Sequence, residues 1–257
     1  MNKTIIAKTS KKVKIMTQNL TLNNMLPAYC KIALCPRCGG EKEIVQIMSG
    51  NTYGAWLWSD SKQVAPMLPQ VSPIQKCPTC GHYYFLKNVS IKKGNTYSYE
   101  EGWLSFDDAI EAFGELMTDD RRHIEEWKAW SWYDKDDEES EAFKTWLQNN
   151  KQKDLELLTI IIAWAFNDII RNGEEPSLEQ YEVFKTTVSS NLKQPILSNN
   201  QLLRGELYRE IGEFDECIAI LGKFNPEDEF LADIRKRIMD KAQEQDDKVF
   251  VIIKGRD

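Results

Sequence analysis

The stretches Cys35-Pro36-Arg37-Cys38-Gly39 and Cys77-Pro78-Thr79-Cys80-Gly81 carry the strongest chemical signal in this sequence. Each stretch places two thiols two residues apart on a tight turn, so that both can ligate one metal ion. The glycine after the second cysteine permits a sharp turn in which backbone N–H groups point at sulfur. The repeated motif predicts a zinc ribbon in which one Zn²⁺ ion is bound by Cys35, Cys38, Cys77 and Cys80.

Four sulfur ligands leave no open coordination position, so the predicted zinc ion is structural rather than catalytic. A redox dithiol would need only one pair beside a βαβ pattern, and two disulfides would need an oxidising compartment. The segment Gly39–Lys76 between the pairs is nearly twice the usual length of about 15–20 residues. We therefore expect an insertion in the ribbon, and we expect Cys30 and Cys217, which are off the spacing, to be ordinary thiols.

The insertion contains a β-prone segment with three aromatic residues, Tyr53, Trp56 and Trp58, and it ends at the polar turn Ser59-Asp60-Ser61. The three rings could form an exposed contact surface for bases or for a peptide. Alternatively, they cover a ribbon that is too small to bury a core unaided. We expect the second arrangement, because aromatic residues in strands usually pack.

The 257 residues are 42% hydrophobic and include eight tryptophans, which is typical of folded domains. Residues 1–28 form a basic arm, expected to be flexible, whose lysines Lys8, Lys11, Lys12 and Lys14 are candidate nucleic-acid contacts. Residues 29–98 form the zinc ribbon with its inserted aromatic hairpin, and residues 99–257 form a helical domain. The predicted fold class is α+β, mainly α, with a β-rich zinc ribbon followed by an all-α domain.

Apolar residues recur at helical spacing after Glu100. Ser105 followed by Asp107 and Asp108 predicts a helix start with acidic residues in the first turn. The stretch Leu155–Ile170 is apolar on almost every side, which predicts a helix at the centre of a helical core. Gly173 is expected to end it, and no role is assigned to the β-prone run 249–253.

The stretch Leu203–Leu221 resembles a tetratricopeptide repeat, and the predicted helix pair lies near 199–224. Six residues match the motif's glycine, tyrosine, turn glycine, aromatic, small and large apolar positions: Gly205, Tyr208, Gly212, Phe214, Cys217 and Leu221. Arg204, Phe224 and Pro226 depart from it. One repeat cannot bury its apolar face alone, so the resemblance implies stacked neighbours, namely 155–170 with 177–191 before the pair and 227–243 after it.

The whole chain resembles uncharacterised bacterial proteins in which an N-terminal zinc ribbon is joined to a tetratricopeptide-like helical region. That resemblance implies the fold and one bound zinc ion, and it implies no activity.

The charges divide sharply along the chain. Residues 1–98 hold 13 Lys and Arg against 3 Asp and Glu, whereas residues 99–257 hold 20 against 37. This asymmetry indicates either an anionic partner for the front of the molecule or docking of the basic ribbon on its own acidic half. Both interpretations stay open at this stage.

The location of the protein is predicted from the apolar runs. The N-terminal residues lack the continuous apolar stretch of a signal peptide, and the longest apolar run, 160–166, is too short to span a bilayer. We expect a cytoplasmic protein without a membrane partner, a setting that suits thiolates bound to zinc. The sequence does not indicate an oligomeric state.

Three function classes follow from these features. The first is a non-enzymatic scaffold or adaptor that binds another protein through the helical surface. The second is a regulatory protein that binds DNA or RNA through the basic arm and the ribbon. The third, an enzyme, is least supported, because His82 and His123 are the only histidines and no nucleophile elbow, phosphate loop or dinucleotide fingerprint occurs. His82, next to the second knuckle, is a candidate second-sphere group or substitute ligand, although a histidine in this position is more often a surface residue of the ribbon.

Overall fold

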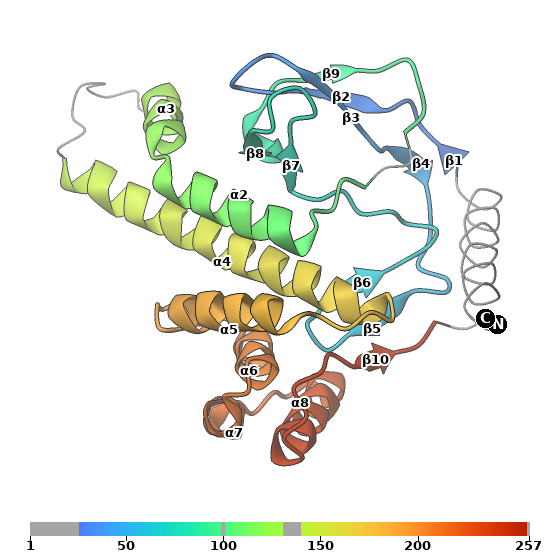
Figure 1. Cartoon of the computed structure of the whole chain (residues 1–257), viewed down its shortest axis with the longest axis vertical. Coiled ribbons are helices and arrows are strands. Elements are labelled where there is room, and N and C mark those ends of the chain that lie inside the picture. Colours follow the sequence, from blue (N-terminus) through green and yellow to red (C-terminus); the bar gives the residue numbers. More distant parts are fainter. Residues whose placement is uncertain (1–25, 99–100, 131–139, 256–257) are drawn as a thin grey trace. The chain divides into compact units, whose positions relative to one another are not determined.

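The computed structural model describes residues 26–98, 101–130 and 140–255, and these residues form two compact units (Figure 1). Of the described residues, the ribbon unit contains those from Leu26 to Leu57, those of the stretch Gln63–Trp103, and those from Ile253 to Gly255. The helical unit contains Trp58–Lys62 and Leu104–Ile252. The lysines predicted to contact nucleic acid, Lys8, Lys11, Lys12 and Lys14, lie outside the described residues.

The ribbon unit is built from short antiparallel strands. These are β1 (Leu26–Pro27), β2 (Lys31–Leu34), β3 (Glu41–Ile44), β4 (Ile47–Ser49), β5 (Trp56–Trp58, whose last residue is assigned to the helical unit), β6 (Gln63–Val64), β7 (Ile74–Lys76), β8 (Tyr83–Phe85) and β9 (Ile91–Lys93), with a 3-10 turn at Leu86–Asn88. The strand β2 lies between β3 and β9, while β7 pairs with β8 and β1 with β4. In the segment predicted to carry an aromatic hairpin, β5 pairs antiparallel with β6, and Trp56 lies opposite Val64.

The helical unit contains seven α-helices among the described residues. They are α2 (Phe106–Thr118), α3 (Arg121–Trp130), α4 (Glu141–Arg171), α5 (Leu178–Leu192), α6 (Gln201–Glu210), α7 (Phe214–Lys223) and α8 (Glu229–Gln243). The chain continues to strand β10 (Val251–Ile253), whose last residue is assigned to the ribbon unit. Small antiparallel sheets followed by helices confirm the predicted α+β, mainly α fold class. None of the helices in the described part of the chain combines the length and apolarity needed to cross a membrane.

The long helix α4 organises the helical unit, with α2 and α5 packed along it (Figure 1). Its N-cap is Ser140, whose hydroxyl accepts a hydrogen bond of 3.0 Å from the backbone N–H of Phe143. The apolar stretch predicted to be central supplies most of the buried residues of this helix, as expected from a sequence that is apolar on almost every side. The ring of Phe166 stacks on Phe184 of α5 with 4.1 Å between the ring centroids.

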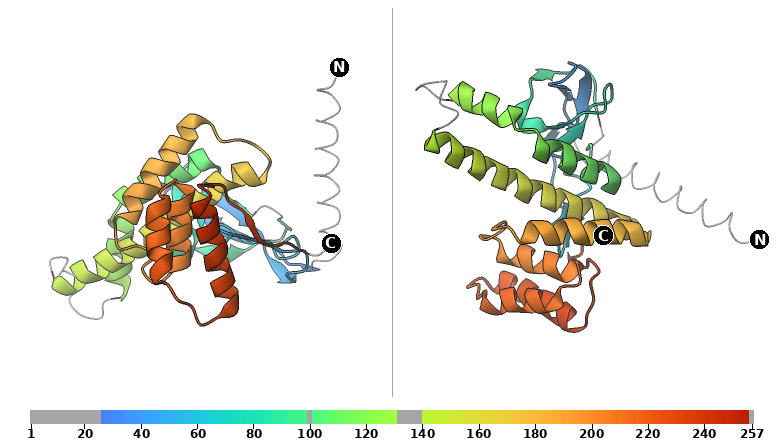
Figure 2. Two further views of the ribbon diagram at one scale, coloured as in Figure 1. Left: turned by 90° about the horizontal axis from the view of Figure 1, so that it is seen from below. Right: turned by 60° about the vertical axis from the view of Figure 1, so that its left-hand side comes forward.

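Helices α6 and α7 occupy the stretch that resembles a tetratricopeptide repeat, and α8 follows them (Figure 2). The turn between α6 and α7 passes through Gly212, whose φ of 78° suits glycine. A Cβ atom added to Gly205 would lie only 2.6 Å from Cγ of Leu221, so the absence of a side chain at this position permits the close approach of the two helices. The tetratricopeptide character of the pair stays a prediction.

Candidate metal centre

The two cysteine motifs fold into turns of the same geometry. In the first, the backbone N–H of Gly39 donates to the carbonyl of Cys35 at 2.9 Å, and in the second that of Gly81 donates to Cys77 at 3.0 Å. Both glycines have φ in the left-handed region, 70° and 75°. Glycine is favoured there because it has no Cβ atom, which explains why each motif ends in this residue.

The four sulfur atoms of Cys35, Cys38, Cys77 and Cys80 form one cluster, with every Sγ within 4.8 Å of the others. Cys35 Sγ lies 3.8 Å from Cys80 Sγ, and Cys38 Sγ lies 3.7 Å from Cys77 Sγ. A disulfide would need about 2.05 Å between sulfurs. For a Zn–S bond of about 2.3 Å, the edge of a regular tetrahedron of sulfur atoms is about 3.8 Å, so the cluster fits a tetrahedral metal ion.

The close approach of the two knuckles depends on Gly40, a residue that the sequence analysis did not select. A Cβ atom at this position would lie 2.7 Å from Oγ1 of Thr79 in the other knuckle and 3.2 Å from Sγ of Cys38. The backbone N–H of Gly40 also lies 3.4 Å from Cys38 Sγ as a donor. Gly40 therefore lets the two turns approach one another and donates a hydrogen bond to the Cys38 sulfur.

The cluster has a buried half and an exposed half. Cys35 and Cys77 are 3% and 2% exposed, whereas Cys38 and Cys80 are exposed. The buried pair packs in the core of the ribbon unit with Ala33 of β2, Ile44 of β3 and Tyr84 of β8. A metal ion in the cluster would thus connect the strands of the ribbon directly to its small core.

The thiols differ in their proton affinities. Burial opposes ionisation of Cys77, but hydrogen bonds from the backbone of Cys80 and Thr79 and from neighbouring thiols lower its pKa to about 6. For Cys38 a hydrogen bond from the backbone of Gly40 favours the thiolate, yet the surrounding thiols raise its pKa to about 12. Like charges at such close range cannot all ionise without a cation, so the cluster could carry four thiolates only with a metal ion bound.

The other two cysteines and the two histidines are not part of the sulfur cluster. Among the described residues the group that could hold a metal ion consists of the four cysteines alone. The backbone carbonyl of His82 accepts a hydrogen bond of 2.8 Å from the N–H of Cys77. Cys30 Sγ lies 3.3 Å from Thr96 Oγ1, and Cys217 is buried in α7. His123 is buried in the helical unit, where its Nε2 lies 3.1 Å from a carboxylate oxygen of Asp154.

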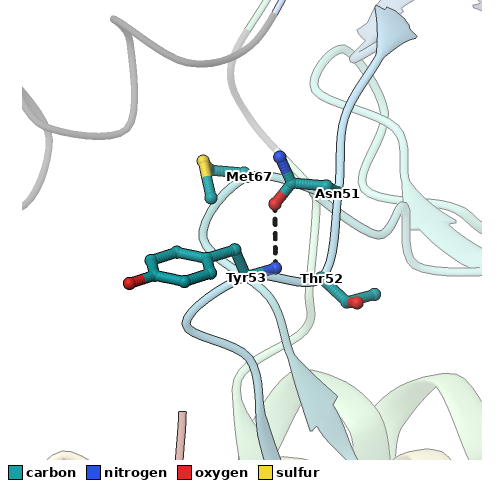
Figure 3. Close-up of a pocket in the computed structure, with 4 residues that line it drawn as sticks. All are labelled: Asn51, Thr52, Tyr53 and Met67. Carbon is teal, nitrogen blue, oxygen red and sulfur yellow. Dashed lines mark hydrogen bonds between the residues drawn. The ribbon is translucent and has the colours of Figure 1, made fainter. Parts of the chain in front are cut away.

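The three aromatic residues predicted as a contact surface have different surroundings. Tyr53 is 59% exposed and lines a shallow hollow of about 680 Å³ with Asn51, whose Oδ1 accepts from Tyr53 N at 2.8 Å (Figure 3). Trp56 is half-buried, with Nζ of Lys254 5.5 Å from its ring centroid. Trp58 belongs to the helical unit, where the guanidinium of Arg171 lies 5.1 Å from its ring centroid.

Comparison with known proteins adds no relative: no protein-family model, no curated protein and no solved structure matches this chain.

Proposed function

We propose that this chain is a non-enzymatic zinc-binding protein, in which one structural Zn²⁺ ion holds the ribbon and the protein acts by binding a partner. The observation that carries the proposal is the cluster of four sulfur atoms, with S–S separations of 3.7 and 3.8 Å. Four thiolate ligands saturate a tetrahedral zinc ion, so no position is left for a substrate or a reactive water molecule.

Metal substitution tests this closed coordination directly. Co²⁺ bound in place of Zn²⁺ should give the absorption of a tetrahedral four-sulfur site, and adding azide or cyanide should leave the spectrum unchanged. A catalytic metal site has an open position, so its spectrum would shift when such a ligand binds. A ligand-dependent shift in the loaded protein would contradict the structural role.

A scaffold or adaptor role through the helical unit is supported by apolar side chains that are exposed on two of its helices. Leu178 at the start of α5 is 87% exposed, and Phe230 and Leu231 at the start of α8 are 45% and 37% exposed. Exposed apolar residues are contacts that a protein partner can bury. Replacing Phe230 and Leu231 with Ser should weaken capture of a protein partner by the loaded chain while its zinc content stays unchanged.

Nucleic-acid binding is the second candidate, because basic and aromatic side chains gather on the ribbon unit. Residues 26–98 hold 8 Lys and Arg against 3 Asp and Glu.

A further inference from the structure

We propose that the ribbon unit binds single-stranded nucleic acid on an exposed surface formed by Tyr29, Lys31, Met48, Ile91, Lys93 and Tyr97, the lysine–tyrosine patch. This inference rests on the proposed function, because the structural zinc ion would hold the ribbon that carries the patch. The zinc ion itself would not contact the nucleic acid. These residues line one hollow of about 480 Å³ on the ribbon unit, together with Pro27, Ala28, Cys30, Gln46 and Lys92.

Two tyrosines supply the stacking surface of the patch. The rings of Tyr29 and Tyr97 stack on one another with 5.1 Å between centroids and 26° between planes. They are nevertheless 48% and 50% exposed, so each retains free aromatic surface. Exposed aromatic rings are the surfaces on which unpaired bases stack, with little preference for sequence.

Two lysines of the patch lie directly opposite one another in the sheet. In the pairing of β2 with β9, Lys31 is the partner of Lys93, and both side chains are exposed. Like charges at directly opposed positions of a sheet destabilise it. Nζ of Lys93 lies 5.9 Å from the ring centroid of Tyr29, so positive charge is placed beside the stacking surface. A phosphate bound between the lysines would relieve their repulsion.

Apolar side chains border the aromatic surface. Met48 is 77% exposed and Ile91 is 43% exposed, and both line the same hollow. A flexible methionine beside stacked rings can adapt to bases of different size. None of the residues that line this hollow is acidic, which matches an anionic ligand and disfavours a basic one.

The positive charge of the patch and the fold of the ribbon unit disfavour two other occupants, the N-terminal segment of the chain and duplex DNA. Residues 1–25 contain five lysines and no acidic residue, so charge repulsion opposes their docking on the patch. Between residues 26 and 98 the described chain forms no α-helix that could enter the major groove of duplex DNA. Unpaired bases can stack on the tyrosines whereas paired bases cannot, so the patch favours a single strand.

The patch is connected to the metal centre through β2. Ala33 pairs with Ile91 of β9 and packs in the core beside Cys35 and Cys77. Loss of zinc should therefore disorder the sheet that carries the patch, and zinc content must be measured for every variant.

The test measures binding of the full-length, zinc-loaded chain to a fluorescein-labelled oligothymidylate of about 12 nucleotides, a length within the usual site sizes. Tyr97→Ala should weaken binding about tenfold, whereas Tyr97→Phe, which keeps the ring, should stay within about twofold. Val64→Ala is the control, because Val64 is also an exposed apolar residue of the ribbon unit but lies outside the patch. It should leave the affinity unchanged.

The lysines are tested through the salt dependence of binding. Each phosphate contact adds about 0.7 to the slope of log affinity against log salt concentration for single strands. Lys31→Gln/Lys93→Gln should therefore lower the slope by about 1.4. Lys223→Gln/Lys236→Gln replaces two exposed lysines of the helical unit and should lower it by much less.

Three outcomes would overturn the inference. The first is no binding of the oligonucleotide at about 50 mM salt by protein that contains its full zinc. The second is equal affinity of the wild type and Tyr97→Ala, or equal affinity for a duplex of the same length. The third is equally tight binding of a polyglutamate peptide that also loses affinity in Tyr97→Ala, which would make the patch a site for an acidic protein. In each case a normal zinc content would leave the proposed function intact.

Discussion

Asp60 and Arg171 form a buried ion pair although 111 residues separate them in the chain. Asp60 is fully buried, and the Arg171 side chain is only 6% exposed. The same carboxylate accepts a hydrogen bond of 3.0 Å from Asn167 Nδ2, and the backbone carbonyl of Asp60 accepts from Trp164 Nε1 at 3.0 Å. The short segment Trp58–Lys62 is thereby attached to helix α4 as part of the helical unit.

Asp60→Ala should destabilise the helical unit strongly. Removing one partner of a buried ion pair leaves the other charge uncompensated, which costs about 3–5 kcal/mol. The loss should be near the lower end of that range, because Arg171 also pairs with Asp168 at 2.8 Å. Denaturant unfolding followed by helical circular dichroism measures the change in free energy.

The control for this pair is Asp233→Ala. Asp233 is 61% exposed and lies 4.0 Å from Arg237, so its loss should cost less than about 1 kcal/mol. Equal stabilities of the Asp60→Ala and Asp233→Ala variants would show that the buried pair does not stabilise the unit.

Gly205→Ala should also destabilise the helical unit, by about 1–3 kcal/mol, because the added Cβ atom would lie 2.6 Å from Leu221 Cγ and overpack the contact between α6 and α7. Gly114→Ala in helix α2 is the matched control. A Cβ atom there meets no atom within 4 Å, so alanine should stabilise the helix by about 0.5–1 kcal/mol. Thermal or denaturant unfolding of both variants compares the two effects, and stabilisation by Gly205→Ala would contradict the close approach.

The buried carboxylic acid Glu210 should make stability depend on pH. Burial raises its pKa well above the ordinary value, and the nearby carboxylates of Glu206 and Asp60 add to the effect. The folded state therefore binds this proton more tightly than the unfolded state. Its contribution to stability is fully present below the ordinary carboxyl pKa and decreases as pH rises through the raised value, by at most about 1.4 kcal/mol per pH unit.

Glu210→Gln removes this ionisation, so the free energy of unfolding of the variant should fall less than that of the wild type between about pH 5 and pH 8. The exposed Glu216 provides the control variant Glu216→Gln, whose pH dependence should follow the wild type. Denaturant unfolding at several pH values in this range gives the free energy of unfolding of the wild type and of both variants. Parallel curves for the wild type and Glu210→Gln would refute the effect.

Local patterns in the sequence predicted much of this structure. The cysteine turns were predictable because a two-residue spacing followed by glycine determines the backbone of a knuckle within five residues. The helix start at Ser105 was predictable because the capping side chain and the acidic residues of the first turn are adjacent, and Ser105 Oγ accepts from Asp108 N at 3.2 Å. The helix at 155–170 followed from a run that is apolar on almost every side.

Features that depend on distant residues could not be predicted in the same way. Ser59-Asp60-Ser61 has the composition of an exposed turn, and only the fold brings Arg171 and Asn167 to bury Asp60. The lysine–tyrosine patch is assembled from separate segments around β1, β2, β4 and β9, so no window of sequence contains it. The close packing at Gly40 likewise depends on Thr79 in the other knuckle.

The central claim is that Cys35, Cys38, Cys77 and Cys80 bind one zinc ion, and elemental analysis of the full-length protein purified without chelator tests it most directly. We predict one zinc per chain in the wild type, loss of that zinc in Cys80→Ser, and retention in Cys217→Ala, which removes a cysteine buried outside the cluster. Wild-type protein without bound metal, or a Cys80→Ser variant that retains its full zinc, would contradict the account.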